Sequence, residues 1–141
     1  GDEWTDPSIF RYKDKWWLLT SNTKHDVLNI YFSEDLTGGW RPHTQNPVRA
    51  SDKHFSRPGG RVIIYNGKLL RFAQDDDPDY GIQVFAFEIT GLSETVYTEK
   101  QVSVNPVITK TGNGWNAAGM HHVDLYQTGN KWMAAVDGRC R

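Results

Sequence analysis

Polar residues of different types stand at the openings of three similar segments of this chain, and these residues could do chemistry. Asp6 opens the first segment, Arg57 the second, and the pair His121-His122 the third. Each segment continues with an apolar stretch ending in Tyr, a tight polar turn ending in Lys, and a second apolar stretch. Shared positions are typical of scaffold, so the positions that differ in type are the candidates for a ligand site.

Asp6 supplies a carboxylate that could act as a general base or a nucleophile on a sugar. Such catalysis needs a second carboxylic acid roughly 5 to 9.5 Å away as the proton donor, and Asp124, Glu88 and Asp75 are the candidates. Alternatively, Asp6 before Pro7 caps a turn by accepting hydrogen bonds from backbone amides.

Arginines that flank a glycine pair could bind the carboxylate or phosphate of a sugar derivative. Arg57 and Arg61 stand on either side of Pro58-Gly59-Gly60, where missing side chains let a ligand or a neighbouring backbone come close. A guanidinium grips a carboxylate or phosphate through two parallel hydrogen bonds. Alternatively, Arg57 forms a salt bridge between neighbouring sheets, to Asp6 or Asp75.

Arg71 and Asp75 are further candidates for substrate contact. Strand alternation groups Arg71 with Leu69 and Ala73, and a buried Arg among apolar neighbours must be paired, which favours a structural tie. Asp75 opens an acidic run that ends at Asp79. The run lacks the spaced ligands and the Gly of a calcium loop, so a solvated turn is favoured.

His122 and Asp124 form a candidate pair because residues at i and i+2 of a strand share a face. An imidazole oriented by a carboxylate could transfer protons or hydrogen-bond a sugar hydroxyl. His121 points to the opposite face, so the two His cannot chelate one ion; it is a candidate for substrate contact or for packing against a neighbouring sheet. Trp115 stands near a loop, where an indole can stack on a sugar, although burial is the commoner fate of Trp.

The elements that must position these residues are hairpins recurring at roughly 50 to 60 residues, a spacing typical of radially arranged β-sheets. The sequence predicts an all-β fold, a β-propeller in one domain over residues 1–141, with about three blades' worth of four-stranded antiparallel sheet. The units are approximately residues 1–52, 53–115 and 116–141. Because the third unit holds only its inner hairpin, we expect a partial ring or one completed by oligomerisation through blade edges.

Strands are expected wherever β-branched and aromatic residues alternate between turn signals. Asn66-Gly67 is the dipeptide best suited to a type I′ hairpin turn. No helix of ordinary length is expected, because Pro, Gly and β-branched residues interrupt each candidate. The expected strands cover residues 8–12, 16–21, 27–33, a short stretch after 40, 62–65, 68–74, 80–89, 96–100, 123–127 and 131–136.

Composition narrows the partners of the chain. The net charge is -1, with 16 basic and 17 acidic residues interspersed, which disfavours nucleic acid and membrane surfaces as partners. The single cysteine, Cys140, can form no internal disulfide, and the cellular compartment stays open. No phosphate loop, serine-hydrolase elbow or paired-Cys zinc site occurs, so no metal and no cofactor are expected.

Several motifs together resemble a known family. They are Asp-Pro-Ser-Ile-Phe with Lys-Trp-Trp-Leu-Leu, Trp40-Arg41-Pro42-His43, Arg57-Pro58-Gly59-Gly60-Arg61, Leu70-Arg71-Phe72-Ala73-Gln74-Asp75 and His121-His122-Val123-Asp124. This set resembles the later blades of the propeller domain at the N-terminus of plant glucosamine inositolphosphorylceramide transferases, a domain that is similar to the five-bladed propellers of glycoside hydrolase families 43, 32 and 68. The resemblance implies sugar chemistry, and Asp6 matches the Asp-Pro context of a catalytic or supporting aspartate in the related hydrolases.

Two functions follow as hypotheses. The first is a carbohydrate-active module that binds a small carbohydrate and is glycosidase-like or glycan-binding. In this case Asp6, His122 and Asp124 are catalytic, and Arg57, Arg61, Arg71, Asp75, His121 and Trp115 contact substrate. The alternative is a non-catalytic structural or assembly fragment of a propeller. A second carboxylate beside Asp6 would favour the first hypothesis, for which Arg57→Ala is expected to weaken sugar binding at a stability cost of only roughly 1 kcal/mol.

Overall fold

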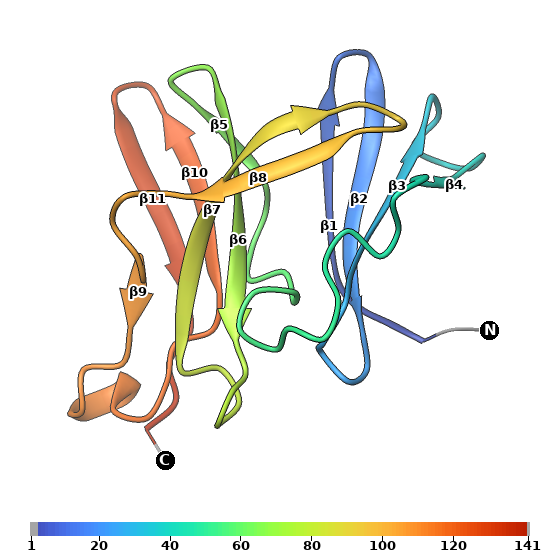
Figure 1. Ribbon diagram of the computed structural model, residues 1–141. Helices are drawn as coiled ribbons and strands as arrows, with labels where there is room; N and C mark the ends of the chain where they lie inside the picture. The colour runs from blue at the N-terminus through green and yellow to red at the C-terminus, as the bar shows by residue number, and fades with distance from the viewer. Residues whose placement is uncertain (1–2, 141) are drawn as a thin grey trace.

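The computed structural model describes residues 3–140, so the outer ends of the first and third expected units lie outside the described residues. Within that range the chain forms eleven β-strands and one short 3-10 helix, and no α-helix. The strands make three antiparallel sheets that stand beside one another (Figure 1). β3 and β6 bury residues at consecutive positions, so these strands are covered on both faces.

The first sheet has four strands in sequence order, and its inner hairpin turns at Lys13-Asp14, where both residues have positive φ (49° and 62°). Such φ values are those of a type I′ turn, which fits the twist of the flanking strands. The strands are β1 (Trp4–Tyr12), β2 (Lys15–Asn22), β3 (Leu28–Ser33) and β4 (Arg41–Pro42).

The second sheet repeats this order and adds a short fifth strand to β7. Its hairpin turns at Asn66-Gly67, both at positive φ, as expected from that dipeptide. The strands are β5 (Ile63–Tyr65), β6 (Lys68–Asp75), β7 (Gln83–Leu92), β8 (Tyr97–Gln101) and β9 (Ile108–Thr109). The third sheet is the hairpin of β10 (Val123–Thr128) and β11 (Lys131–Val136), preceded by the 3-10 helix Gly114–Asn116.

Three features depart from the expected strands. β7 spans Gln83–Leu92 rather than residues 80–89. β9 and the 3-10 helix were not expected, because each is too short to show a periodic pattern. β1 begins at Trp4 rather than at Ser8, since Trp4 pairs with Asn22 and the register shifts between Thr5 and Ser8. The chain therefore bulges at Asp6, whose φ of 49° is unusual for a residue other than Gly.

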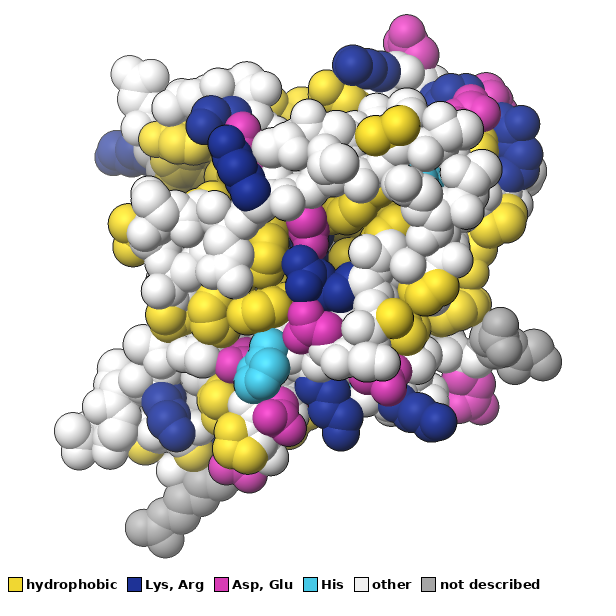
Figure 2. All heavy atoms as spheres, in the orientation of Figure 1, with side chains coloured by type: hydrophobic (Ala, Val, Ile, Leu, Met, Phe, Trp, Pro, Cys, Tyr) yellow, Lys and Arg dark blue, Asp and Glu magenta, His cyan; other side chains and the backbone are white. Residues whose placement is uncertain are grey.

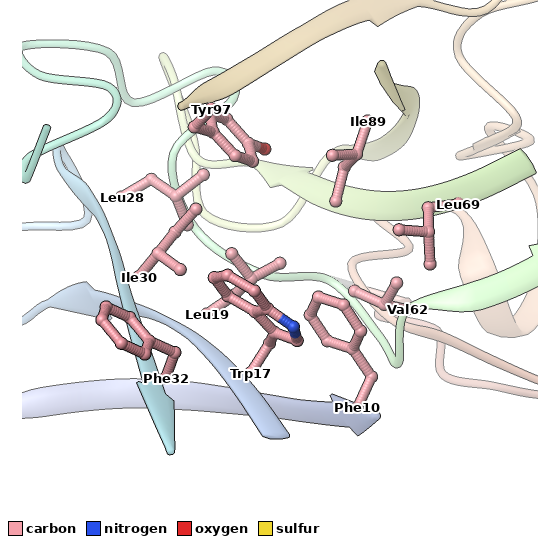
Figure 3. Close-up of a cluster of buried hydrophobic side chains, with 10 residues drawn as sticks. All are labelled: Phe10, Trp17, Leu19, Leu28, Ile30, Phe32, Val62, Leu69, Ile89 and Tyr97. Carbon is pink, nitrogen blue, oxygen red and sulfur yellow. The ribbon is translucent and has the colours of Figure 1, made fainter. Parts of the chain in front are cut away.

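The main core lies between the first and second sheets. Figure 3 shows side chains of β1, β2 and β3 pointing toward residues of the second sheet, with Trp17 between them. Trp17 is 2% exposed, and its indole N–H donates to the carbonyl of Tyr12 at 3.1 Å, so its one polar group is satisfied. The buried members are Phe10, Trp17, Leu19, Leu28, Ile30, Phe32, Val62, Leu69, Ile89 and Tyr97.

A buried ion pair within the second sheet is extended by an arginine from the first unit. Arg71 on β6 is 1% exposed and donates from Nε and Nη2 to both carboxylate oxygens of Glu99 on β8. Glu99 also accepts from the hydroxyl of Tyr97 at 2.6 Å and from Arg49, in the loop after the first sheet, at 2.6 Å. Because Arg49 comes from the first unit, its hydrogen bond to Glu99 joins the loop of that unit to the second sheet.

Further ion pairs continue from this network along the seam between the units. Arg49 also donates to Asp52 at 2.7 Å, and His54 and Asp75 lie 2.8 Å apart. Figure 2 shows charged side chains of both signs following one another down the middle of one face, with apolar groups on either side. The seam therefore combines an apolar core with matched charges.

A smaller apolar cluster of Phe72, Val84, Ala86 and Val123 joins the second and third sheets. Beside it lies an apolar groove of about 990 Å³, bounded by residues of the second sheet and of the two-stranded third sheet. All six residues of β11 are exposed, and within residues 3–140 no strand pairs with its outer edge.

Glu99 should give the fold a distinct pH dependence. Burial raises the pKa of Glu99, but the charge and hydrogen bonds of Arg71 overcome this effect and lower the pKa to about 2. A carboxyl group whose pKa falls on folding stabilises the fold above its ordinary pKa near 4.5, and this stability is lost as the pH falls toward 2.

We expect Glu99→Gln to lose about 3–5 kcal/mol at pH 6, because it leaves Arg71 buried without its counter-charge. It should also flatten the fall in stability between pH 4.5 and 2. Urea unfolding across this range is the measurement, with Glu94→Gln, in an exposed pair with Lys15, as the control that changes little. Parallel pH curves for Glu99→Gln and the parent would contradict this role of Glu99.

The open edge of β11 should promote self-association. An unpaired strand edge beside an exposed apolar groove favours pairing with another chain. We expect sedimentation of a dilute sample to give a mass above the 16.1 kDa of one chain, and Ala134→Glu, which places a charge in the groove, to lower it. A parent protein that sediments as a compact monomer would contradict this expectation.

Candidate functional site

A hollow of about 420 Å³ lies where the three sheets begin, and each of the three units contributes to its wall. Asp6 and Ile9 come from β1, Arg61 from the segment before β5, and His122 and Asp124 from the opening of β10. Openings of successive hairpins thus converge on one mouth. The complete lining is Asp6, Pro7, Ser8, Ile9, Pro58, Gly60, Arg61, His122 and Asp124.

The bulge in β1 presents Asp6 to the hollow and to the second unit at once. The Asp6 side chain is 41% exposed, and its Oδ2 accepts from Nε of Arg57 and from Nε2 of Gln74 at 3.3 Å. Asp6 therefore serves as an acceptor from the second unit while part of its carboxylate faces solvent. The expected turn-capping bonds from backbone amides to Asp6 are not among the hydrogen bonds found in residues 3–140.

Gly60 brings the second and third units into backbone contact. Its φ is 152°, and a Cβ at this position would lie 1.9 Å from the carbonyl oxygen of Val123. The amide of Val123 donates to the carbonyl of Gly59 at 2.8 Å. The backbone of the third unit therefore packs against the Pro-Gly-Gly segment. Of the two alternatives from sequence, close approach of a ligand or of a neighbouring backbone, the structure shows the second.

Arg61 and Asp124 form an exposed pair across the mouth. Arg61 donates from Nε and Nη2 to the two carboxylate oxygens of Asp124, the second bond measuring 2.7 Å. The side chains are 52% and 30% exposed, so solvent or a ligand reaches both. The hydrogen bond with Asp124 raises the pKa of Arg61 above its already high ordinary value, so this guanidinium stays charged.

His122 lies beside this pair with an exposed side chain. Its amide donates to Oδ1 of Asp137 at 2.8 Å, and the amide of His121 donates to the same oxygen at 3.1 Å. Asp137 thus fixes the backbone just before β10. As expected from alternation, His122 and Asp124 line the hollow, whereas His121 does not.

Arg57 is outside the hollow, contrary to the expectation that it contacts the ligand. It is 8% exposed, and besides Asp6 it contacts Oδ2 of Asp76 at 3.2 Å and lies over the ring of Tyr80 at 5.1 Å. The alternative interpretation, a salt bridge between sheets, fits this geometry, although the second partner is Asp76 and not Asp75. A group so enclosed is unavailable to a sugar.

Arg71 and Asp75 are enclosed as well and do not line the hollow. Arg71 forms an ion pair with Glu99, as expected if Arg71 has a structural role and does not contact substrate. Asp75 is 2% exposed and accepts from His54 and from Gln83 at 2.8 Å. Both side chains organise the sheets, and neither belongs to the proposed site.

His121 and Trp115 also lie outside the lining of the hollow. The imidazole of His121 pairs with Asp137, and its ring lies 5.0 Å from that of Tyr80. Trp115 is 58% exposed on the 3-10 helix. Sequence reasoning missed Ile9, which is 46% exposed in the hollow; as the neighbour of buried Phe10 on an alternating strand, it could have been placed there.

The described part of the chain gives no metal centre: within residues 3–140 no group of three His, Cys, Asp or Glu could hold an ion. In the same range no helix has the length and apolar character needed to cross a membrane. Cys140 is free and exposed.

Comparison with solved structures identifies the fold. BT0996, solved in a complex with RGII, matches 90% of this chain and 44% of its own length, with a TM-score of 0.61 at 15% identity. A family 117 glycoside hydrolase of Zobellia galactanivorans matches 97% and 43%, with a TM-score of 0.57 at 14% identity. A thermostable family-43 glycoside hydrolase matches 87% and 37%, with a TM-score of 0.54 at 13% identity. The all-β propeller fold and the similarity to family 43 are confirmed.

Sequence relatives point to one family. Glucosamine inositolphosphorylceramide transferase 1 is 37% identical in Oryza sativa subsp. japonica and 31% identical in Arabidopsis thaliana, in both cases over 142 aligned residues and 94% of this chain. The chain spans only 19% of the length of these relatives. The family model described as glucosamine inositolphosphorylceramide transferase 1, N-terminal, matches residues 2–139, and the chain therefore belongs to that N-terminal family.

Proposed function

We propose that this chain is a glycan-binding part of a propeller and that the hollow between its three sheets is the sugar site. One observation carries the proposal: three successive hairpins bring exposed donors, acceptors and an apolar surface to a single hollow of about 420 Å³. Small-ligand sites are concave, with a few convergent polar groups on an apolar wall. Sugar-related names among the similar proteins, a glucosamine inositolphosphorylceramide transferase and two glycoside hydrolases, support a carbohydrate as the ligand.

The exposed pair of Arg61 and Asp124 suits a hydroxylated ligand. A sugar hydroxyl both donates and accepts, so neighbouring hydroxyls can accept from the guanidinium and donate to the carboxylate. His122 adds a further polar group beside them, and Ile9 offers an apolar surface to the C–H face of a sugar ring. All three units then contact one ligand.

The charges favour a neutral sugar over an acidic one. Arg57 is paired with Asp6 and Asp76, and Arg61 with Asp124, so both guanidinium charges are already balanced by carboxylates. An incoming carboxylate would meet Asp6 and Asp124 in the same hollow, and like charges repel. From the sequence, Arg57 and Arg61 were expected to bind the carboxylate or phosphate of a sugar derivative. We now propose a neutral sugar instead.

Hydrolysis is a second candidate because Asp6, His122 and Asp124 share the hollow. A glycosidase needs one carboxylic acid that keeps its proton and donates it to the leaving group. Both oxygens of Asp124 accept from Arg61, and Asp6 accepts from Arg57, so each serves as an acceptor. This arrangement suits binding better than acid catalysis, and release of reducing sugar from the bound glycan would favour hydrolysis instead.

Calorimetric titration with cellotetraose, xylotetraose, mannotetraose and tetragalacturonate tests the site. We expect the parent to bind a neutral tetrasaccharide and Arg61→Ala or Asp124→Asn to lower its affinity about tenfold or more, the scale of one hydrogen bond to a charged group. Both variants should fold, because exposed ion pairs contribute only about 0–1 kcal/mol to stability.

The matched control is Arg41→Ala. Arg41 is also 52% exposed and paired to a carboxylate, Glu34, but it lies on β4, away from the hollow. The affinity of this variant should equal that of the parent. A parent that binds no sugar of the panel, or an Arg61→Ala variant that binds like the parent, would overturn the proposed site; preference for tetragalacturonate would overturn the neutral-sugar assignment.

A further inference from the structure

We propose that Trp115 is the platform of a second sugar subsite next to the hollow, so that the ligand is an oligosaccharide and not a single sugar. This inference rests on the proposed function of the hollow. Trp115 is among the most exposed large apolar side chains in residues 3–140, at 58%. Contacts with the segment that follows β11 hold this exposed indole in place.

One edge of the indole lies against a glycine. A Cβ built on Gly138 would fall 2.2 Å from Cε3 and 2.3 Å from Cζ3 of Trp115, so the six-membered ring rests on the Gly138 backbone. Any side chain at Gly138 would displace the ring. With this edge held by the backbone and more than half of the residue in solvent, the ring is fixed and accessible to a ligand.

Hydrogen bonds hold the segment that carries the Trp115 ring. Asn116, the next residue, is 7% exposed; its Oδ1 accepts from Thr111 at 2.6 Å, and its amide contacts Sδ of Met120 at 3.0 Å. Ala118 and Gly119 pair with Arg139 through backbone hydrogen bonds of 2.7 to 3.2 Å. The 3-10 helix is thus clamped to the segment that follows β11, and Trp115 has little freedom to fold away.

A short series of contacts joins this platform to the hollow. His122 lines the hollow, and its amide is held by Asp137, the residue that directly precedes Gly138. Figure 1 shows the short 3-10 helix and the turn into β10 at the end of the molecule where the C-terminus lies. A glycan seated on Arg61 and Asp124 can therefore continue past His122 onto the indole.

The open indole selects by shape. An aromatic face offers an apolar surface that matches the C–H face of a pyranose, and sugar hydroxyls at the ring edge remain in water. Stacking needs no charge, so the platform favours a neutral unit, as does the hollow. The expected gain is up to about tenfold in affinity for an oligosaccharide that reaches Trp115 over a monosaccharide that does not.

Titration of the parent, Trp115→Ala and Trp115→Phe with each neutral tetrasaccharide and its monosaccharide tests the subsite. We expect Trp115→Ala to lose about tenfold in tetrasaccharide affinity with no change for the monosaccharide, and Trp115→Phe to retain most of the affinity because it keeps a ring face. Tyr126→Ala is the control: Tyr126 is 57% exposed on β10 but does not line the hollow. In parallel, the indole N–H resonance of Trp115 should move with tetrasaccharide and stay in place with monosaccharide.

The outcomes separate this inference from the function on which it rests. If Trp115→Ala binds tetrasaccharide like the parent while Arg61→Ala does not, the second subsite is wrong and the hollow stands. If no sugar of the panel binds the parent, both fall. If Trp115→Ala loses monosaccharide and tetrasaccharide affinity equally, Trp115 acts on the hollow through the backbone and is no subsite.

Discussion

The buried cluster of Arg71, Glu99 and Arg49 is the constraint that fixes the first unit against the second sheet. A guanidinium that is 1% exposed must find its counter-charge inside the protein, because an unpaired buried charge costs several kcal/mol. Glu99 meets this need from β8 and also accepts from Arg49 of the preceding unit. This cluster therefore joins the loop of the first unit to β6 and β8 of the second.

Three arginines of the second unit show how burial sorts residues of one type into different roles. Arg71 is fully enclosed and stabilises the seam, Arg57 is largely enclosed and joins Asp6 to Asp76, and Arg61 stands half in solvent with Asp124. Exposure thus rises toward the mouth. Only the outermost pair is able to exchange its partner for a ligand, which is why we assign sugar binding to Arg61.

The repeat of hairpins predicts the fold well because the signals are local. The pairing of β5 with β6 follows from the turn at Asn66-Gly67, which is set by neighbours in sequence. The site was harder to predict, since its residues lie more than fifty positions apart. No local pattern tells that Asp76 rather than Asp75 reaches Arg57, or that Gly60 faces the backbone of Val123; these follow only from how one unit packs on the next.

Arg57 joins Asp6 of the first unit to Asp76 of the second, and so holds Asp6 and the neighbouring Arg61 segment at the mouth of the hollow. Urea unfolding of Arg57→Ala tests this claim most directly. Because Asp76 has a side chain only 3% exposed, removing Arg57 takes a counter-charge from a buried carboxylate, and we predict a loss of about 3–5 kcal/mol. A loss below about 1 kcal/mol, the scale of an exposed substitution, would contradict this role of Arg57.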